Sequence, residues 1–154
     1  MTAQIIQSPS LEKQNKQHAI FLAGGITGCP DWQRVLIPLI SHLDITIYNP
    51  RRTNFDVKDF SVAEIQIAWE YERPHHVDAV SFWFAKETIQ PIVLFELGGA
   101  LERPIMVFVG VHSEYSREFD VRKQTELSSH YIPVARSIWD LSAQISAWEW
   151  KCNA

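Results

Sequence analysis

The apolar run Ala79–Phe84 is the sequence feature that most constrains the fold, because only Ser81 within it is polar. A strand on the surface of a sheet alternates apolar and polar residues, whereas a strand covered on both faces is apolar throughout. Covered strands of this kind are typical of parallel sheets with a helical layer on each side. The run therefore predicts a sheet buried between two layers of helices.

The rest of the chain repeats the alternation of short apolar runs with helical periodicity. Strands are expected at 18–26, 45–48, 79–84, 105–109 and 131–134, and helices at 31–43, 61–73, 91–102, within 112–129 and from 138 onward. Strand–helix–strand connections give parallel strands joined by right-handed crossovers. We predict a single Rossmann-like or flavodoxin-like α/β domain over residues 18–154, with about five mostly parallel strands flanked by helices. The polar residues 1–17 are expected to be a flexible leader.

Composition excludes several classes of partner. The net charge of -4 argues against a surface for polymeric nucleic acid or for an anionic membrane. Cys29 and Cys152 are too few and too far apart for a disulfide framework or a zinc site. We therefore expect a cytoplasmic protein that binds no metal and no membrane.

Glu96 is the most unusual charged residue, because the run Pro91–Leu101 around it holds no other charge. On a helix, the residues three and four positions away are apolar or small: Ile92, Val93, Gly99 and Ala100. A carboxylate that faces an apolar surface is costly unless it is paired, neutral or used in chemistry. We interpret Glu96 as a nucleophile towards a sugar, with an ordinary structural glutamate as the alternative.

Glu70 is the second candidate carboxylate. It lies in the helix before the strand at 79–84, and Glu96 lies in the helix after it, so both can converge near the carboxyl end of that strand. Paired carboxylates suit glycosidic chemistry, with one as nucleophile and the other holding the sugar or moving protons. Because Glu70 has charged neighbours in sequence, a solvated helix face is an equal alternative.

A glycine turn, Ala23–Gly28, follows the first apolar run. Its glycines let backbone amides approach a ligand closely, which suits a binding turn. The turn matches neither G-x-G-x-x-G nor the P-loop pattern, and Asn49 stands where a dinucleotide site would have an acidic residue. A plain tight turn is an equally good interpretation, and no organic cofactor is expected.

Several motifs together resemble the nucleoside 2-deoxyribosyltransferase-like proteins between about residues 18 and 110. They are Phe21–Gly28 with Trp32, Asn49–Arg52, Trp69–Glu70, Asp78 and Phe95–Gly98. The resemblance implies that Glu96, in its E-L-G motif, is the nucleophile, and that Glu70 holds the sugar and shuttles protons where the family more often has aspartate. It also implies that Gly24, Gly25 and Ile26 of the glycine turn bind substrate in the sugar and base region. Asp78 is expected either to bind substrate or to cap the strand that it opens.

Base recognition is expected to differ from that of several family members, which carry an aspartate six residues before the nucleophile. This chain has Gln90 at that position. Asn54, Phe55 and Asp56, in the loop after the second strand, are the candidates to contact the base. Trp32 and Trp69 are further candidates, because aromatic rings stack on bases.

The activity implied by the resemblance is exchange of the base of a 2′-deoxynucleoside through a glycosyl ester on Glu96. The partners are then small nucleosides and free nucleobases, and a homo-oligomer is expected because in several members a neighbouring subunit completes the site. One alternative is an N-glycosidase that hydrolyses a nucleoside or its 5′-monophosphate, with Arg34, Arg51 and Arg52 as candidate phosphate contacts. Another is a non-catalytic nucleotide-binding domain.

Overall fold

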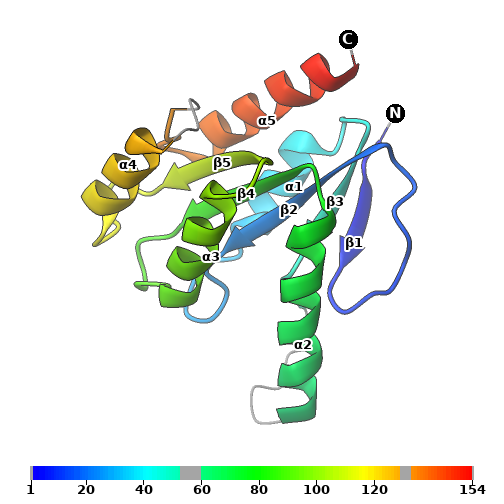
Figure 1. Ribbon diagram of the computed structural model, residues 1–154, viewed down its shortest axis with the longest axis horizontal. Helices are drawn as coiled ribbons and strands as arrows, with labels where there is room; N and C mark the ends of the chain where they lie inside the picture. The colour runs from blue at the N-terminus through cyan, green and yellow to red at the C-terminus, as the bar shows by residue number, and fades with distance from the viewer. Residues whose placement is uncertain (1, 53–59, 129–132, 154) are drawn as a thin grey trace.

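The predicted apolar runs become parallel strands at the centre of the computed structural model, which describes residues 2–52, 60–128 and 133–153. The strands are β1 (Gln4–Gln7), β2 (His18–Gly24), β3 (Ile45–Asn49), β4 (Ala79–Phe84) and β5 (Met106–Val111). The helices are α1 (Gln33–Ile40), α2 (Phe60–Glu72), the short 3-10 helix η1 (Arg73–His76), α3 (Pro91–Leu101), α4 (Glu118–Leu127) and α5 (Ile138–Asn153). All strand pairs are parallel and the order is β1-β3-β2-β4-β5 (Figure 1). The predicted α/β fold is therefore confirmed.

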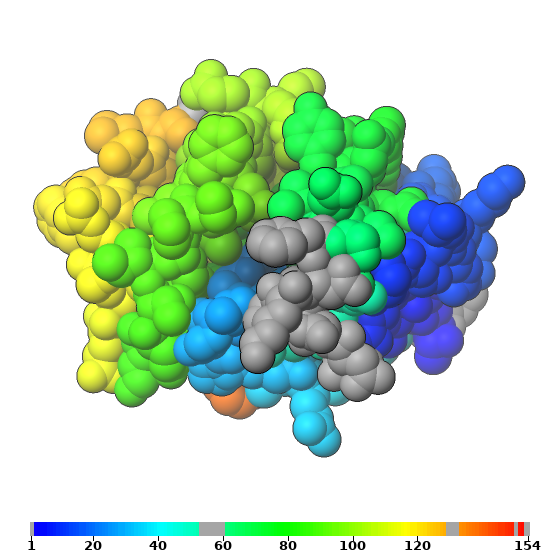
Figure 2. Space-filling view, turned by 90° about the horizontal axis from the view of Figure 1, so that it is seen from below, coloured from blue at the N-terminus to red at the C-terminus, as the bar shows by residue number. Residues whose placement is uncertain are grey.

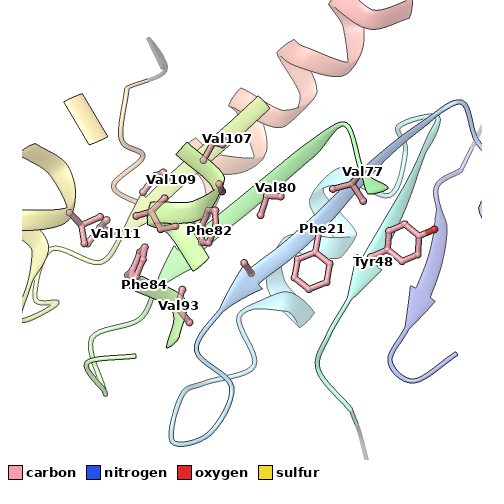
Figure 3. Close-up of a cluster of buried hydrophobic side chains, with 14 of the residues drawn as sticks. Phe21, Tyr48, Val77, Val80, Phe82, Phe84, Val93, Val107, Val109 and Val111 are labelled. Carbon is pink, nitrogen blue, oxygen red and sulfur yellow. The ribbon is translucent and has the colours of Figure 1, made fainter. Parts of the chain in front are cut away.

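Two apolar cores separate the sheet from its helices. One core joins side chains of α2, α3 and α4 to one face of the sheet, and most of its labelled members in Figure 3 lie on the sheet strands, with Val93 contributed by α3. The other core joins α1 and α5 to the opposite face. Every residue of β4 is buried, as the apolar run Ala79–Phe84 predicted for a strand covered on both sides.

The fifth strand is β1, at the edge of the sheet beside β3, where Ile5 is in register with Ile47. Residues 4–7 are therefore part of the fold, which corrects the expectation that they belong to a flexible leader. The apolar pattern of residues 4–7 is weak because this edge strand buries only one of its two faces. Ile6 is 1% exposed, whereas Ile5 is 44% exposed.

The strand expected at 131–134 falls partly outside the described residues, and the fifth strand of the described sheet is β1. Residues 131 and 132 lie outside the described residues, and 133 and 134 are not in a strand. Ala135 forms only an isolated parallel bridge with Gly110 of β5. In the described part of the chain, no helix has the length and apolar character needed to cross a membrane.

Because the strands are parallel, their carboxyl ends share one edge of the sheet. Gly24 at the end of β2 is in register with Trp83, near the end of β4. The glycine turn, the chain after Asn49 and the segment after Phe84 therefore meet at this edge. This is the edge where open α/β sheets bind their ligands.

Candidate active site

A pocket of about 550 Å³ lies at the carboxyl edge of the sheet. It is lined by the end of β2 and its glycine turn, the chain after β3, helix α2, and the start of α3 with the segment before it. In Figure 2 the light-blue β2–α1 turn and the green helix α3 lie side by side on this face of the molecule. Five predicted site residues line the pocket together: Gly24, Gly25, Ile26, Glu70 and Glu96.

Glu96 is placed by α3, which begins with Pro91 at its first turn. Val93, Leu97 and Ala100 fix the buried face of this helix, and Glu96 lies beside that face, half-buried in the pocket wall. Burial raises the pKa of Glu96 from 4.5 to about 7, and the neighbouring negative charge of Glu70 contributes to the rise. Near neutral pH the carboxyl group is therefore divided between its ionised and neutral forms.

Glu70 faces the same pocket from α2. Burial raises the pKa of this carboxyl group, and a hydrogen bond from the side chain of Gln66 acts in the opposite direction. Gln66 Nε2 donates to Glu70 Oε1 at 2.6 Å. Because the charge of Glu70 raises the pKa of Glu96, the two groups titrate as an interacting pair.

Gln66 is a site residue that the sequence analysis missed. It lines the pocket, it is buried, and it lies one helical turn before Glu70. The available signal was its spacing, because Gln and an acidic residue four positions apart on a helix can hydrogen-bond. Its other contacts are long-range, to Pro50 and Ser8, and leave no local pattern.

The glycine turn has no room for side chains where it faces the core. A methyl group on Gly24 would lie 2.5 Å from the ring of Trp32 and 2.6 Å from the carbonyl oxygen of Trp83. Trp32 Nε1 donates to the carbonyl oxygen of Gly25 at 3.1 Å. Trp32 and Trp69 are buried core residues and do not line the pocket, so the structure gives no support to base stacking on these rings.

Gln90 joins the glycine turn to the segment before α3. Its Oε1 accepts from the backbone N–H of Gly25 at 3.0 Å, and its Nε2 donates to the carbonyl oxygens of Ala85 at 2.7 Å and Thr88 at 3.0 Å. Its backbone is in the left-handed region with φ 56°, which costs energy in a residue other than glycine. The side chain is thus engaged within the protein and holds two walls of the pocket together.

Arg51, in the chain after β3, contacts the backbone of the glycine turn and of the residues that follow it. Its Nη2 lies 2.9 Å from the carbonyl oxygen of Pro30 and 3.4 Å from those of Gly25, Ile26 and Cys29. Its Nε donates to Gln33 at 2.9 Å and lies 3.3 Å from a carboxylate oxygen of Asp31. The guanidinium group therefore supports the turn.

The two other arginines considered as phosphate contacts lie in different settings. Arg34 is exposed and is not among the residues that line the pocket, whereas Arg52 lines it.

Asp78 lies at the amino end of β4, where the strands begin, and is not in the pocket wall. Its Oδ2 accepts from the backbone N–H of Ala19 at 2.8 Å, and its Oδ1 lies 3.7 Å from Nδ1 of His18. The expectation of substrate binding by Asp78 is not met, because a residue that opens a parallel strand lies at the edge opposite the strand's carboxyl end. The alternative of a structural cap agrees with these contacts.

The remaining predicted contacts, Asn54, Phe55 and Asp56, lie outside the described residues.

Among residues 2–52, 60–128 and 133–153, no cluster of three or more histidine, cysteine or acidic side chains could hold a metal ion. The chemistry that the described site offers is that of two coupled carboxyl groups in one pocket. Such pairs can supply a nucleophile together with a proton donor.

Comparison with known proteins gives one family. The family model described as nucleoside 2-deoxyribosyltransferase-like matches residues 17–115, well over half of the chain. The matched range includes every residue assigned to the pocket wall. No curated protein matches the chain.

Proposed function

The chain belongs to the nucleoside 2-deoxyribosyltransferase-like family, and from that premise we propose that it exchanges the base of 2′-deoxynucleosides. The observation that carries this proposal is the position of Glu96 in the pocket, with a pKa near 7 and beside a second carboxyl group, Glu70. With its pKa near 7, part of Glu96 is ionised near neutral pH, and burial also raises the pKa of Glu70. Displacement of a base requires an ionised nucleophile and a proton source for the leaving base, and two coupled carboxyl groups can supply both.

The proposed reaction has two displacements. The reacting form of the coupled pair is the one in which Glu70 carries the proton and Glu96 is ionised. Glu96 attacks C1′ of the nucleoside, the bond between C1′ and the base nitrogen breaks, and the base leaves with the electron pair and receives the proton from Glu70. The sugar is then held as an ester on Glu96. A second base attacks C1′ through its ring nitrogen, gives its proton to Glu70 and releases the Glu96 carboxylate, so that the configuration at C1′ is retained.

The pocket supports a substrate of this class. Its volume of about 550 Å³ is within the usual range for small-molecule sites. Apolar side chains from α2 and from the segment before α3 form part of its wall, including Ile67, Ile89 and Ile92. These apolar side chains offer a contact surface for a nucleobase.

Hydrolysis of a nucleoside 5′-monophosphate is the second candidate, and Arg52 is the observation that favours it. Arg52 is a cationic side chain in the pocket wall, and arginine is well suited to phosphate groups. In this reaction water replaces the second base as the group that attacks the ester.

The test is an incubation of a 2′-deoxynucleoside with a different free base, followed by chromatography. A new nucleoside that depends on Glu96 is the expected product, and Glu96→Ala is the control. Free deoxyribose without new nucleoside would overturn transfer in favour of hydrolysis, and a parallel 5′-monophosphate arm would reveal a phosphate requirement. Absence of turnover across purine and pyrimidine substrates would contradict both catalytic functions.

We also propose that the protein forms a homo-oligomer through the exposed side of α3. Phe95 is 80% exposed and Ile92 is 66% exposed on this helix. A methyl group added at Gly98 or Gly99 would meet no atom within 4 Å, so this side of the helix is open. Light scattering of the purified protein measures the assembly, and Phe95→Glu should reduce it; a monomer for the unchanged chain would contradict the proposal.

The proposed setting is the cytoplasm, with small nucleosides and free bases as partners and no polymeric nucleic acid. Cys29 and Cys152 are both free thiols, and Cys152 is exposed. Free exposed thiols suit a reducing compartment. Fluorescence microscopy of a tagged protein would test the location.

A further inference from the structure

The segment after β1 packs against the helix that carries Glu70. Ser8 Oγ donates to Oε1 of Gln66 at 2.6 Å, and Trp69 Nε1 donates to the carbonyl oxygen of Ser10 at 3.0 Å. Arg73 Nη2 lies 3.4 Å from the same carbonyl oxygen. Residues near the beginning of the chain therefore fix one side of α2.

The side-chain amide of Gln66 is engaged at both of its ends. Its oxygen accepts from Ser8, while its nitrogen donates to the carbonyl oxygen of Pro50 at 2.9 Å and to Glu70 at 2.6 Å. With the amide rotated by half a turn, its oxygen would face two acceptors, so the observed orientation is strongly preferred. Ser8 and Gln66 are both buried, so removal of the serine hydroxyl would leave a buried acceptor without its donor.

The contact from Gln66 fixes one oxygen of the Glu70 carboxyl group and so sets how the group faces the pocket. A hydrogen-bond donor to a carboxylate stabilises the ionised form, which counters the effect of burial. The other charged groups that line this pocket in the described part of the chain are Glu96 on α3 and Arg52 after β3. Gln66 therefore influences both the direction and the proton affinity of Glu70.

We propose that Ser8 and Gln66 are positioning residues, which act through a chain of hydrogen bonds from Ser8 to Gln66 to Glu70. This role rests on the proposed function, because it assigns Glu70 to proton transfer. The amino-terminal segment thereby contributes to the active site although none of the described residues before Phe21 lines the pocket.

The first test is a titration that needs no turnover: carbon-13 NMR of the glutamate carboxyl groups, with the Glu70 signal assigned through Glu70→Gln. In Gln66→Met the Glu70 midpoint should rise by about one pH unit because the donor is lost, and in Ser8→Ala it should rise by less. Ser10→Ala is the matched control, because in the described part of the chain the Ser10 hydroxyl accepts from the exposed backbone N–H of Glu12, and the substitution keeps the carbonyl oxygen of Ser10. Equal midpoints in the unchanged protein, Ser8→Ala and Gln66→Met would overturn the inference.

The second test is activity. Gln66→Met should lower kcat roughly tenfold and Ser8→Ala by a smaller factor, with KM nearly constant, because substrate still binds but the proton donor is misdirected. Ser8→Thr, which keeps a hydroxyl group, should restore part of the loss, and Ser10→Ala should match the unchanged protein. If Ser8→Ala and Ser10→Ala lose stability and activity equally, the segment is merely structural and the inference fails.

The two tests separate the inference from the function on which it rests. If the unchanged protein turns over no nucleoside, the proposed function fails, while the NMR titration still decides whether Ser8 and Gln66 control Glu70. If the protein is active but the Glu70 midpoint does not respond to either substitution, the inference alone fails.

Discussion

The two edges of the sheet hold the same chemical group in different settings. At the amino edge, the carboxylate of Asp78 accepts a hydrogen bond from the backbone of Ala19 and lies near His18. At the carboxyl edge, Glu96 and Glu70 line a pocket, and burial raises the pKa of both. At the amino edge the carboxylate has a hydrogen-bond donor within the protein. At the carboxyl edge, burial disfavours the ionised carboxylates, so their ionisation lowers the stability of the folded protein.

The difference shows that chain direction decides what an acidic residue beside a strand does. Asp78 directly precedes β4 and therefore lies at the amino edge, whereas Glu96 follows the end of β4 and lies in the pocket at the carboxyl edge. Loss of a carboxylate at the amino edge should reduce stability, and loss at the carboxyl edge should reduce activity. The substitutions below test this division.

The largest effect is expected for Glu96→Gln, which should lower base exchange by about 10⁴-fold or more because the nucleophile is lost. Mass spectrometry of the intact protein with substrate should show a sugar adduct in the unchanged protein and none in this variant. Circular dichroism serves as the control for folding. Activity retained in Glu96→Gln would remove Glu96 from the proposed role.

Glu70→Gln should lower kcat by roughly 10²-fold to 10³-fold because the leaving base loses its proton donor. A deoxyribosyl donor whose leaving group needs no proton should be affected much less. The acidic limb of kcat/KM, set by ionisation of Glu96 with its pKa of about 7, should also move to lower pH, because removal of the Glu70 charge lowers the pKa of Glu96. An unchanged limb would contradict the proposed coupling of the pair.

The pH dependence of stability should change in Glu96→Gln. The pKa of Glu96 is raised from 4.5 to about 7 in the folded protein, so its contribution to stability is fully present below pH 4.5 and is lost as the pH rises through 7. Relative to the unchanged protein, the variant should therefore gain about 2 kcal/mol in the free energy of unfolding between pH 5 and pH 8. Urea denaturation at both pH values measures this, and an equal difference at the two pH values would refute it.

The smallest effect is expected at the amino edge, where Asp78→Asn should cost about 1 kcal/mol of stability because a charged acceptor for the Ala19 N–H is lost. Base exchange should stay within about twofold of the unchanged protein, because Asp78 does not line the pocket and lies at the opposite edge of the sheet. Thermal denaturation and the exchange assay measure the two quantities. A large loss of activity in a stable variant would place Asp78 back among the functional residues.

Most strands and helices, and the position of Glu96, could be predicted from the sequence because they depend on local patterns. Apolar runs and helical spacing predicted β2–β5 and most helices, and the isolated charge of Glu96 predicted its place in the wall. The contacts of Ser8, Gln90 and Arg51 join segments far apart in sequence, so no local pattern reveals them. Strand β1 was missed for a related reason, because its two isoleucines have glutamines on both sides and only one of the two is buried.

The contacts of Arg51 have a consequence for engineering the specificity of this fold. One guanidinium group joins the chain after β3 to four carbonyl groups of the β2–α1 connection, so these two parts of the rim form one mechanical unit. Residues 24–33 cannot be exchanged for the equivalent turn of a relative without also supplying Arg51 and a compatible path for the chain after β3. The unit to transfer is therefore the β2–α1 connection together with the chain after β3, because Arg51 joins them. Substitutions designed on one of these two segments will be constrained by the other.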